Sequence, residues 1–169
     1  MGKIACAVMI VFSGMAAVTL AAKSALADER ERLIGTWKLV EGMNEDLATG
    51  EKTNVYKGVA VGFITYGADG RIMAIVVDSG RKKPAGSVVT GPEAEALFRT
   101  MTAYAGSYTM KGGQIIHHVD ASWNETWTGS DQIRNYKFDG DRLSLATAPS
   151  PNPFTGKMSV RTFVWEKVK

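Results

Sequence analysis

Alternation of apolar and polar residues with a period of two is the feature that most constrains the fold of this chain. Runs of this kind, separated by turn-forming residues, are typical of antiparallel strands with one buried face. In the first run, Trp37, Leu39 and Met43 alternate with polar neighbours. The expected strands are Thr36–Met43, Val59–Tyr66, Arg71–Val77, Tyr104–Met110, Gln114–Trp123, Gln132–Phe138, Arg142–Ala148 and Lys157–Val168, with a weaker strand around Asn54–Lys57.

Short glycine-containing loops connect several of these strands as hairpins. The loops are Gly67–Gly70, Lys111–Gly113 and Asp139–Asp141, and glycine supplies the backbone freedom that tight hairpins need. Consecutive hairpins predict an all-β fold, an antiparallel up-and-down β-barrel of about eight strands with one inserted short helix. An immunoglobulin-like sandwich is the alternative, but the Cys…Trp…Cys core of that fold is missing from this sequence.

The inserted helix is expected to start after Thr90. Thr90 and Glu93 have the spacing of a capping box, and Pro92 suits the first turn. Ala94, Leu97, Phe98 and Met101 then follow on one helical face, and the helix should end before Gly106. This apolar face is expected to point toward the core, or else the helix covers the barrel mouth as a lid.

The N-terminal 27 residues are typical of a secretory signal peptide. A basic Lys3 precedes an apolar stretch, and small residues at Ala25 and Ala27 suit cleavage before Asp28. A retained membrane anchor is the alternative, because about 19 apolar residues can span a bilayer. We therefore expect residues 1–27 to be a signal peptide, residues 28–169 to be the barrel domain, and the protein to be periplasmic or secreted, without membrane insertion after cleavage.

Composition excludes several function classes. The net charge of +3 falls to +1 when Lys3 and Lys23 leave with the signal peptide, so no basic surface for nucleic acid is expected. The single cysteine, Cys6, lies in the same segment, which excludes an internal disulfide and thiolate metal sites. No metal and no cofactor is expected.

Strand alternation also predicts which polar side chains point inward. His117 and His118 must face opposite sides of their strand and cannot easily share a metal. The face of His117 is the more apolar and should be the inner one, shared with Ile115, Val119, Ala121 and Trp123. The inner face of the next strand should carry Gln132, Arg134, Tyr136 and Phe138, and the preceding strand should add Tyr104, Tyr108 and Met110.

An inward-facing arginine is costly unless an opposite charge neutralises it. No acidic residue lies on these inner faces, so an anionic ligand group such as a carboxylate is expected near Arg134. Alternatively, Arg134 extends to the barrel rim and His117 is a hydrogen-bonded core residue. His118 with Asp120 has the spacing of a His–carboxylate dyad, although an exposed strand face explains it as well. The candidate ligand-binding residues are His117, Arg134, Gln132, Tyr108, Tyr104, Trp123 and Tyr136.

Several segments of the mature chain resemble those of a known protein family. The opening Leu33–Val40, with its Gly-x-Trp, looks like the start of lipocalins, and the whole mature chain resembles the bacterial and fungal lipocalin-like domain family. The matching segments are Tyr66–Arg71, His117–Asp120, Asp131–Arg134, Phe138–Leu143 and Val164–Glu166. The resemblance implies a calycin-type barrel with a ligand-sized interior. It also implies that Trp37 closes one barrel end, with Arg161 stacked over it.

Two function classes remain open at this stage. The first is binding of a small apolar or amphipathic molecule, with or without a carboxylate, in the barrel interior. The second is a cofactor-independent isomerase, cyclase or hydrolase acting on a lipid-like or polyketide-like substrate, with His117 as general acid–base and Arg134 and Tyr108 stabilising negative charge.

Overall fold

The structure is a computed structural model that describes residues 26–56, 59–152 and 155–169. The chain divides into two compact units, Met1–Leu33 and Ile34–Lys169. In the first unit, residues 26–33 are helical. The expected signal peptide falls almost wholly on residues 1–25, outside the described residues, so it stays a prediction. Among the residues that are described, no helix has the length and apolar character needed to cross a membrane.

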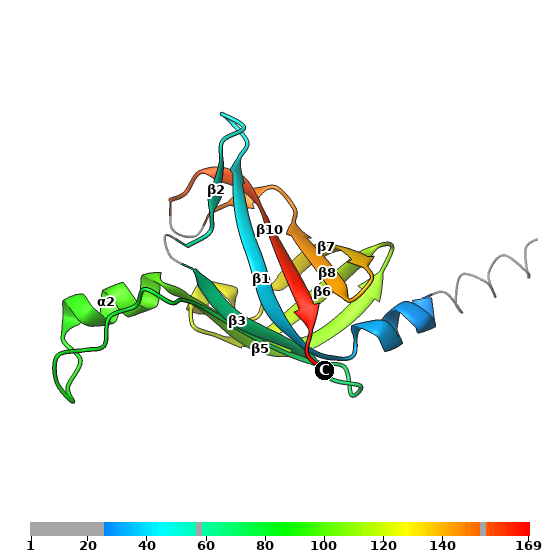
Figure 1. The fold of residues 1–169 in the computed structure, drawn as a ribbon, viewed down its shortest axis with the longest axis horizontal. Coiled ribbons are helices and arrows are strands. Elements are labelled where there is room, and N and C mark those ends of the chain that lie inside the picture. Colours follow the sequence, from blue (N-terminus) through cyan, green and yellow to red (C-terminus); the bar gives the residue numbers. More distant parts are fainter. Residues whose placement is uncertain (1–25, 57–58, 153–154) are drawn as a thin grey trace, which may run out of the picture. The chain divides into compact units, whose positions relative to one another are not determined.

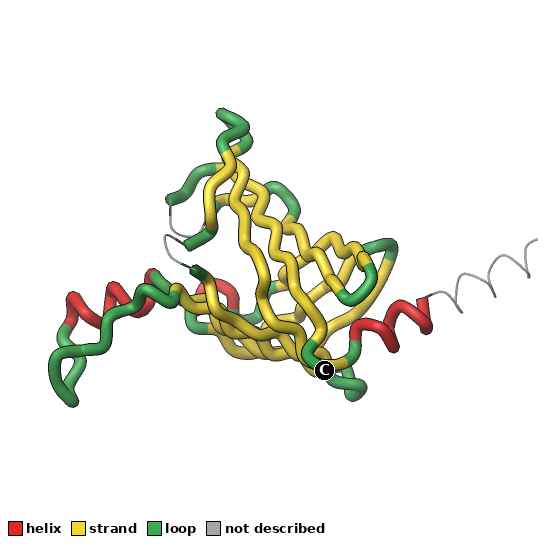
Figure 2. Tube along the Cα trace, in the orientation of Figure 1, coloured by secondary structure: helices red, strands yellow, loops and turns green. Residues whose placement is uncertain are grey.

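The second unit is built from strands (Figures 1 and 2). In chain order its elements are β1 (Gly35–Asp46), β2 (Lys52–Asn54), β3 (Ala60–Tyr66), β4 (Arg71–Asp78), α2 (Gly91–Arg99), β5 (Met101–Lys111), β6 (Gln114–Ser122), the 3₁₀ helix η1 (Glu125–Trp127), β7 (Asp131–Asp139), β8 (Arg142–Thr147), β9 (Ser150–Pro151) and β10 (Met158–Lys167). The expected long strands are all present. The weak strand lies at Lys52–Asn54 rather than Asn54–Lys57, because its pairing is with the far end of β1.

The sheet closes on itself. Neighbouring strands pair in the order β1-β3-β4-β5-β6-β7-β8-β10, and β10 returns to pair with β1 in antiparallel register from Trp37↔Lys167 to Asp46↔Ser159. Figure 1 shows β1 and β10 running side by side across the front of the barrel. Eight strands therefore form a closed antiparallel barrel, with β2 and β9 as short additions, and the predicted fold class is confirmed. Closure removes the free sheet edges that would otherwise pair with other chains.

The period-two pattern sets the inside and the outside of the barrel. Along β4, Ile72, Ala74 and Val76 are buried, whereas Met73 and Ile75 between them are exposed. The β5–β6 hairpin turns at Gly112 and Gly113, which have φ of 58° and 76°. Positive φ at both central positions suits a two-residue turn of the type that matches strand twist. The alternation and the glycine loops together account for the hairpin order.

A β-bulge interrupts the alternation between β5 and β6. Gly106 pairs with Val119 but Ala105 pairs with Ala121, so Asp120 is an extra residue on β6. A Cβ at Gly106 would lie 1.9 Å from the carbonyl oxygen of His118, so only glycine fits there. Beyond the bulge Ala121 is exposed, and its expected inward position is wrong because the extra residue shifts the period by one.

Helix α2 is present but does not pack into the core. The capping box forms, with the Thr90 N–H donating to the Glu93 carboxylate at 2.9 Å. No residue of α2 is buried, Phe98 remains 44% exposed, and Met101 belongs to β5. The expected core-facing stripe is wrong: Phe98 instead lies 6.2 Å from the ring of Trp123, which does not line the barrel interior cavity.

Trp37 closes one end of the barrel, but Arg161 does not cover it. The Trp37 ring is 2% exposed and lies 6.0 Å from the Phe138 ring, centroid to centroid. The cation above it is Lys167, whose Nζ lies 5.1 Å from the ring centroid. The expected Arg161 stack is therefore wrong: the antiparallel register opposes Trp37 to Lys167, six residues along β10 from Arg161.

Candidate functional site

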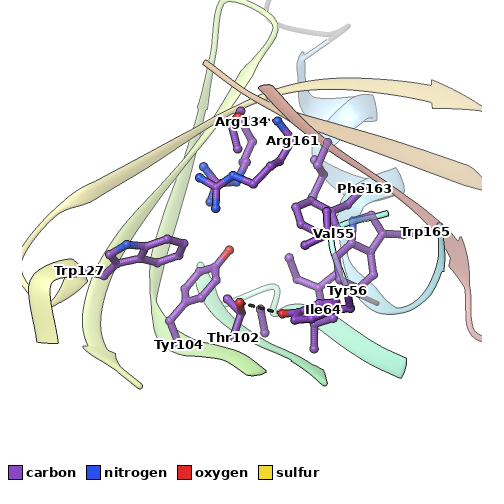
Figure 3. A pocket seen from close by; sticks show the side chains of 14 residues that line it. Val55, Tyr56, Ile64, Thr102, Tyr104, Trp127, Arg134, Arg161, Phe163 and Trp165 are labelled. Carbon is purple, nitrogen blue, oxygen red and sulfur yellow. Dashed lines mark hydrogen bonds between the residues drawn. The ribbon is translucent and has the colours of Figure 1, made fainter. Parts of the chain in front are cut away.

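Two arginines face the barrel interior from neighbouring parts of the wall. Arg134 on β7 is 7% exposed and Arg161 on β10 is 8% exposed. Figure 3 shows their guanidinium groups converging on one space, opposite the hydroxyl of Tyr104. The predicted inward orientation of Arg134 is correct, and Arg161 joins it there.

Neither arginine has an acidic partner among the described residues. The Arg134 guanidinium donates to the carbonyl oxygen of Ile133 at 2.9 Å and, at 3.5 Å, to Oε1 of Gln132. The buried Nε of Arg161 has no hydrogen-bond acceptor. Burial, reinforced by the charge of Arg134, lowers the pKa of Arg161 to about 10. Arg161 therefore stays cationic at neutral pH, and no acidic side chain of the described residues neutralises either guanidinium.

The arginines border a small cavity. The space open to the centres of water-sized molecules is about 40 Å³, room for roughly three waters. The wall opposite the arginines is mainly apolar, and Tyr56 and Thr102 add a hydroxyl pair at 2.9 Å. The lining residues are Val55, Tyr56, Ile64, Ala74, Val76, Thr102, Tyr104, Trp127, Arg134, Leu145, Thr147, Arg161, Phe163 and Trp165.

A chain of three hydrogen-bonded side chains lies behind this cavity. The Tyr104 hydroxyl is 2.9 Å from Nδ1 of His117, and the Tyr66 hydroxyl is 2.8 Å from Nε2 of the same ring. His117 is fully buried and does not line the cavity. Burial, followed by the charge of Arg134, holds the pKa of His117 well below its usual range, so the ring is neutral. Burial also raises the pKa of both tyrosines.

Three other expected ligand-binding residues are Tyr108, Gln132 and Tyr136. Tyr108 is buried, and its hydroxyl donates to the Gly67 carbonyl oxygen at 3.0 Å. Gln132 is half-buried. Its Nε2 donates a hydrogen bond to the Ser130 hydroxyl at 3.0 Å, and its Oε1 accepts one from Arg134 at 3.5 Å. Tyr136 is half-buried, with its ring 5.6 Å from that of Phe138. None of these three lines the cavity, and a role for them in binding stays a prediction.

The bulge on β6 turns Trp123 away from the cavity, and Trp127 lines the cavity instead. The Trp123 ring packs 5.0 Å from Trp127 and 6.2 Å from Phe98, outside the cavity. Trp127, from η1, lines the cavity and lies 5.6 Å from the Tyr104 ring. Because η1 follows the shifted end of β6, simple alternation could not place Trp127.

Arg161 could have been found from the sequence. Counting back from Trp165 in steps of two along its strand gives Phe163, Arg161 and Ser159, and these residues point inward together. The resemblance to lipocalins instead predicts that Arg161 stacks over Trp37, so Arg161 is missing from the predicted ligand-binding residues.

His118 faces outward, where it pairs with a residue other than the expected Asp120. Its Nδ1 lies 2.7 Å from the Asp131 carboxylate and its Nε2 lies 3.0 Å from the Thr109 hydroxyl. Asp120 instead pairs with Arg71 at 2.7 Å. The two histidines therefore sit on opposite sides of the wall, and no group of three metal-ligating side chains occurs in the part of the chain that the structure describes.

A closed eight-stranded antiparallel barrel with a few polar groups around an inner cavity defines a lipocalin-like barrel. The family described as "Lipocalin-like domain" matches residues 34–168. The chain belongs to this family, and such a barrel indicates small-molecule binding in general.

A crystal structure of an uncharacterized protein from Bacteroides eggerthii DSM 20697 is similar at 14% sequence identity and a TM-score of 0.40, over 80% of this chain and 99% of that one. No curated protein matches the chain.

Proposed function

We propose that the barrel binds a small amphipathic molecule through a carboxylate held by Arg134 and Arg161. The observation that carries this proposal is that both arginines are buried at one cavity and neither meets an acid among the described residues. A buried charge is costly unless it is paired. A carboxylate accepts charge-assisted hydrogen bonds from guanidinium groups and would neutralise part of this charge.

The opposite wall suits the apolar part of such a ligand. Ile64, Val76, Leu145 and Phe163 present hydrocarbon and aromatic surface to the same cavity. Its volume of about 40 Å³ is far below the roughly 300–1,000 Å³ of drug-sized sites. The structure therefore favours a carboxylate with a short tail, and a longer tail needs the lining side chains to move.

A series of straight-chain monocarboxylates tests this proposal. Acetate, butanoate, hexanoate and octanoate are titrated into the purified protein and followed by NMR shift changes, with hexan-1-ol as the uncharged match for hexanoate. We expect hexanoate to bind more tightly than hexan-1-ol. Arg134→Met and Arg161→Met should each weaken hexanoate binding at least tenfold, because a hydrogen bond to a charged group is worth about 1.5–3 kcal/mol.

The matched control is Arg142→Met, which removes an exposed arginine of β8. It should leave the hexanoate dissociation constant unchanged. The proposal fails if no carboxylate of the series binds, if hexan-1-ol binds as tightly as hexanoate, or if the control weakens binding as much as the cavity variants.

The enzyme alternative gains no support from the site. Both ring nitrogens of His117 are engaged by tyrosine hydroxyls, and the ring does not reach the cavity wall. A general acid–base must lie within hydrogen-bond reach of the reacting atom, and His117 would act on a substrate only through Tyr104. Binding is the function that this geometry favours.

We also propose that the protein acts after export, with cleavage before Asp28. The support is the small-residue pair Ala25 and Ala27 after an apolar stretch. N-terminal sequencing of the protein from its own host tests this: a chain starting at Asp28 in the periplasm or medium is expected. A chain that still starts at Met1 in the membrane fraction would favour the retained anchor.

A further inference from the structure

The His117 ring can donate only one of its two hydrogen bonds. A neutral imidazole carries one N–H and one lone pair, and both of its nitrogens face tyrosine hydroxyls, Tyr66 at Nε2 and Tyr104 at Nδ1. One tyrosine must therefore donate its proton to the ring, and the other must accept the ring N–H. The direction of this chain decides which hydroxyl keeps a proton for another partner.

The surroundings of Tyr66 fix that direction. Tyr66 is 1% exposed, and in the described part of the chain its hydroxyl has no hydrogen-bond partner besides His117. If Tyr66 accepted the ring N–H, its own proton would be buried without an acceptor, which is unfavourable. Tyr66 therefore donates to Nε2, and the proton of the ring lies on Nδ1.

The Tyr104 hydroxyl is then left with a free proton. Its oxygen accepts the Nδ1–H of His117, and burial keeps its pKa raised although the charge of nearby Arg134 acts in the opposite direction, so the hydroxyl keeps its proton. Figure 3 shows this hydroxyl pointing into the cavity toward the two guanidinium groups. Arginine has donors but no acceptor, so neither guanidinium can take the Tyr104 proton.

We propose that His117 is a positioning residue that turns the Tyr104 hydroxyl into a third donor for the ligand carboxylate. This inference rests on the proposed function and deepens it. Arg134, Arg161 and Tyr104 then present donors alone to the head group, and a carboxylate accepts from all three. A primary amide would direct its own N–H groups at donors, so the site should select carboxylates over amides of the same size.

The first experiment compares hexanoate and hexanamide binding in two variants that each lose one hydroxyl. Tyr104→Phe should weaken hexanoate binding about tenfold, with little effect on hexanamide, so the preference for the acid should shrink. Thr109→Val is the matched control, because it removes a hydroxyl that lies on the exposed side of β5 and contacts Nε2 of His118 at 3.0 Å rather than the cavity. Equal hexanoate affinity in the wild type and Tyr104→Phe, or equal losses in both variants, would overturn the inference.

The second experiment reads the His117 tautomer directly. Long-range ¹H–¹⁵N correlation spectra of the histidine-labelled protein should show Nδ1 protonated and Nε2 unprotonated, and His118→Gln identifies the signals of His117. A proton on Nε2 would overturn the proposed direction. Because this spectrum needs no ligand, it tests the chain even if hexanoate does not bind, in which case the proposed function fails instead.

Discussion

Replacing Arg161 with methionine tests whether the ligand-free barrel carries an unneutralised buried charge. The pKa of Arg161 falls from its usual high value to about 10, first through burial and then through the charge of Arg134. At 1.36 kcal/mol for each pH unit, the cationic form costs roughly 3 kcal/mol in the folded state. The folded pKa is the lower one, so this cost is present at every pH below about 10 and fades as the pH rises toward the unfolded value.

Methionine keeps part of the buried hydrocarbon and removes the charge. The structure gives the buried Nε of Arg161 no acceptor to lose, but the shorter side chain leaves some space unfilled. We therefore expect Arg161→Met to stabilise the ligand-free protein at pH 7 by about 2 kcal/mol and to raise its Tm by about 4–8 °C. Arg134→Met should gain less, because that guanidinium donates to Ile133 and Gln132.

Urea unfolding and calorimetry at pH 7, with and without hexanoate, measure both effects. Hexanoate should raise the Tm of the wild type and not that of Arg161→Met. Arg142→Met, at an exposed position, should change stability by no more than about 0.5 kcal/mol. A loss of more than about 1 kcal/mol in Arg161→Met would show that the guanidinium is satisfied within the folded protein, and the reasoning from an unpaired charge would be refuted.

Three further predictions concern the framework of the barrel. Gly106→Ala should lower the free energy of unfolding by at least about 2 kcal/mol in urea titrations, because its Cβ would lie 1.9 Å from a backbone carbonyl oxygen of β6; Gly86→Ala, with open space around it, should be nearly neutral. Glu93→Gln should lower the Tm at pH 7, and the difference should vanish as the pH falls through the lowered pKa of Glu93, since backbone hydrogen bonds from Ala85 and Thr90 stabilise its charged form. Lys167→Met should cost about 0.5–1 kcal/mol and alter the tryptophan fluorescence spectrum, through loss of the cation above the ring at the closed end.

The inner face of β7 could be read from the sequence because nothing disturbs its alternation. Arg134 is buried between exposed Ile133 and Asn135, as the period of two requires. On β6 the same rule holds for His117 and fails at Ala121, because the bulge opposite Gly106 depends on a backbone contact between two strands. A local pattern in one strand cannot show such a contact. The same bulge hides the position of Trp127, because η1 follows the shifted end of β6.

Pairwise distances were equally hidden from the sequence. The pattern placed Tyr104 and His117 inside the barrel, but their hydrogen bond depends on the β5–β6 register and on side-chain rotamers. Tyr66 joins them from β3, 51 positions away in the chain. The small size of the cavity likewise follows from how large side chains interdigitate, which alternation does not specify.

The placement of the buried acids supports the proposed role of the arginine pair in binding an anionic ligand. The structure describes two buried acids, Asp46 and Asp78. Asp46 lies 3.2 Å from Lys157, and Asp78 accepts the Gly80 N–H at 2.8 Å. Neither forms an ion pair with Arg134 or Arg161, so two buried acids coexist with two uncompensated cations. With net stability commonly near 5–15 kcal/mol, a cost of roughly 3 kcal/mol at Arg161 is a large share, and the anion that we propose as the ligand would offset it.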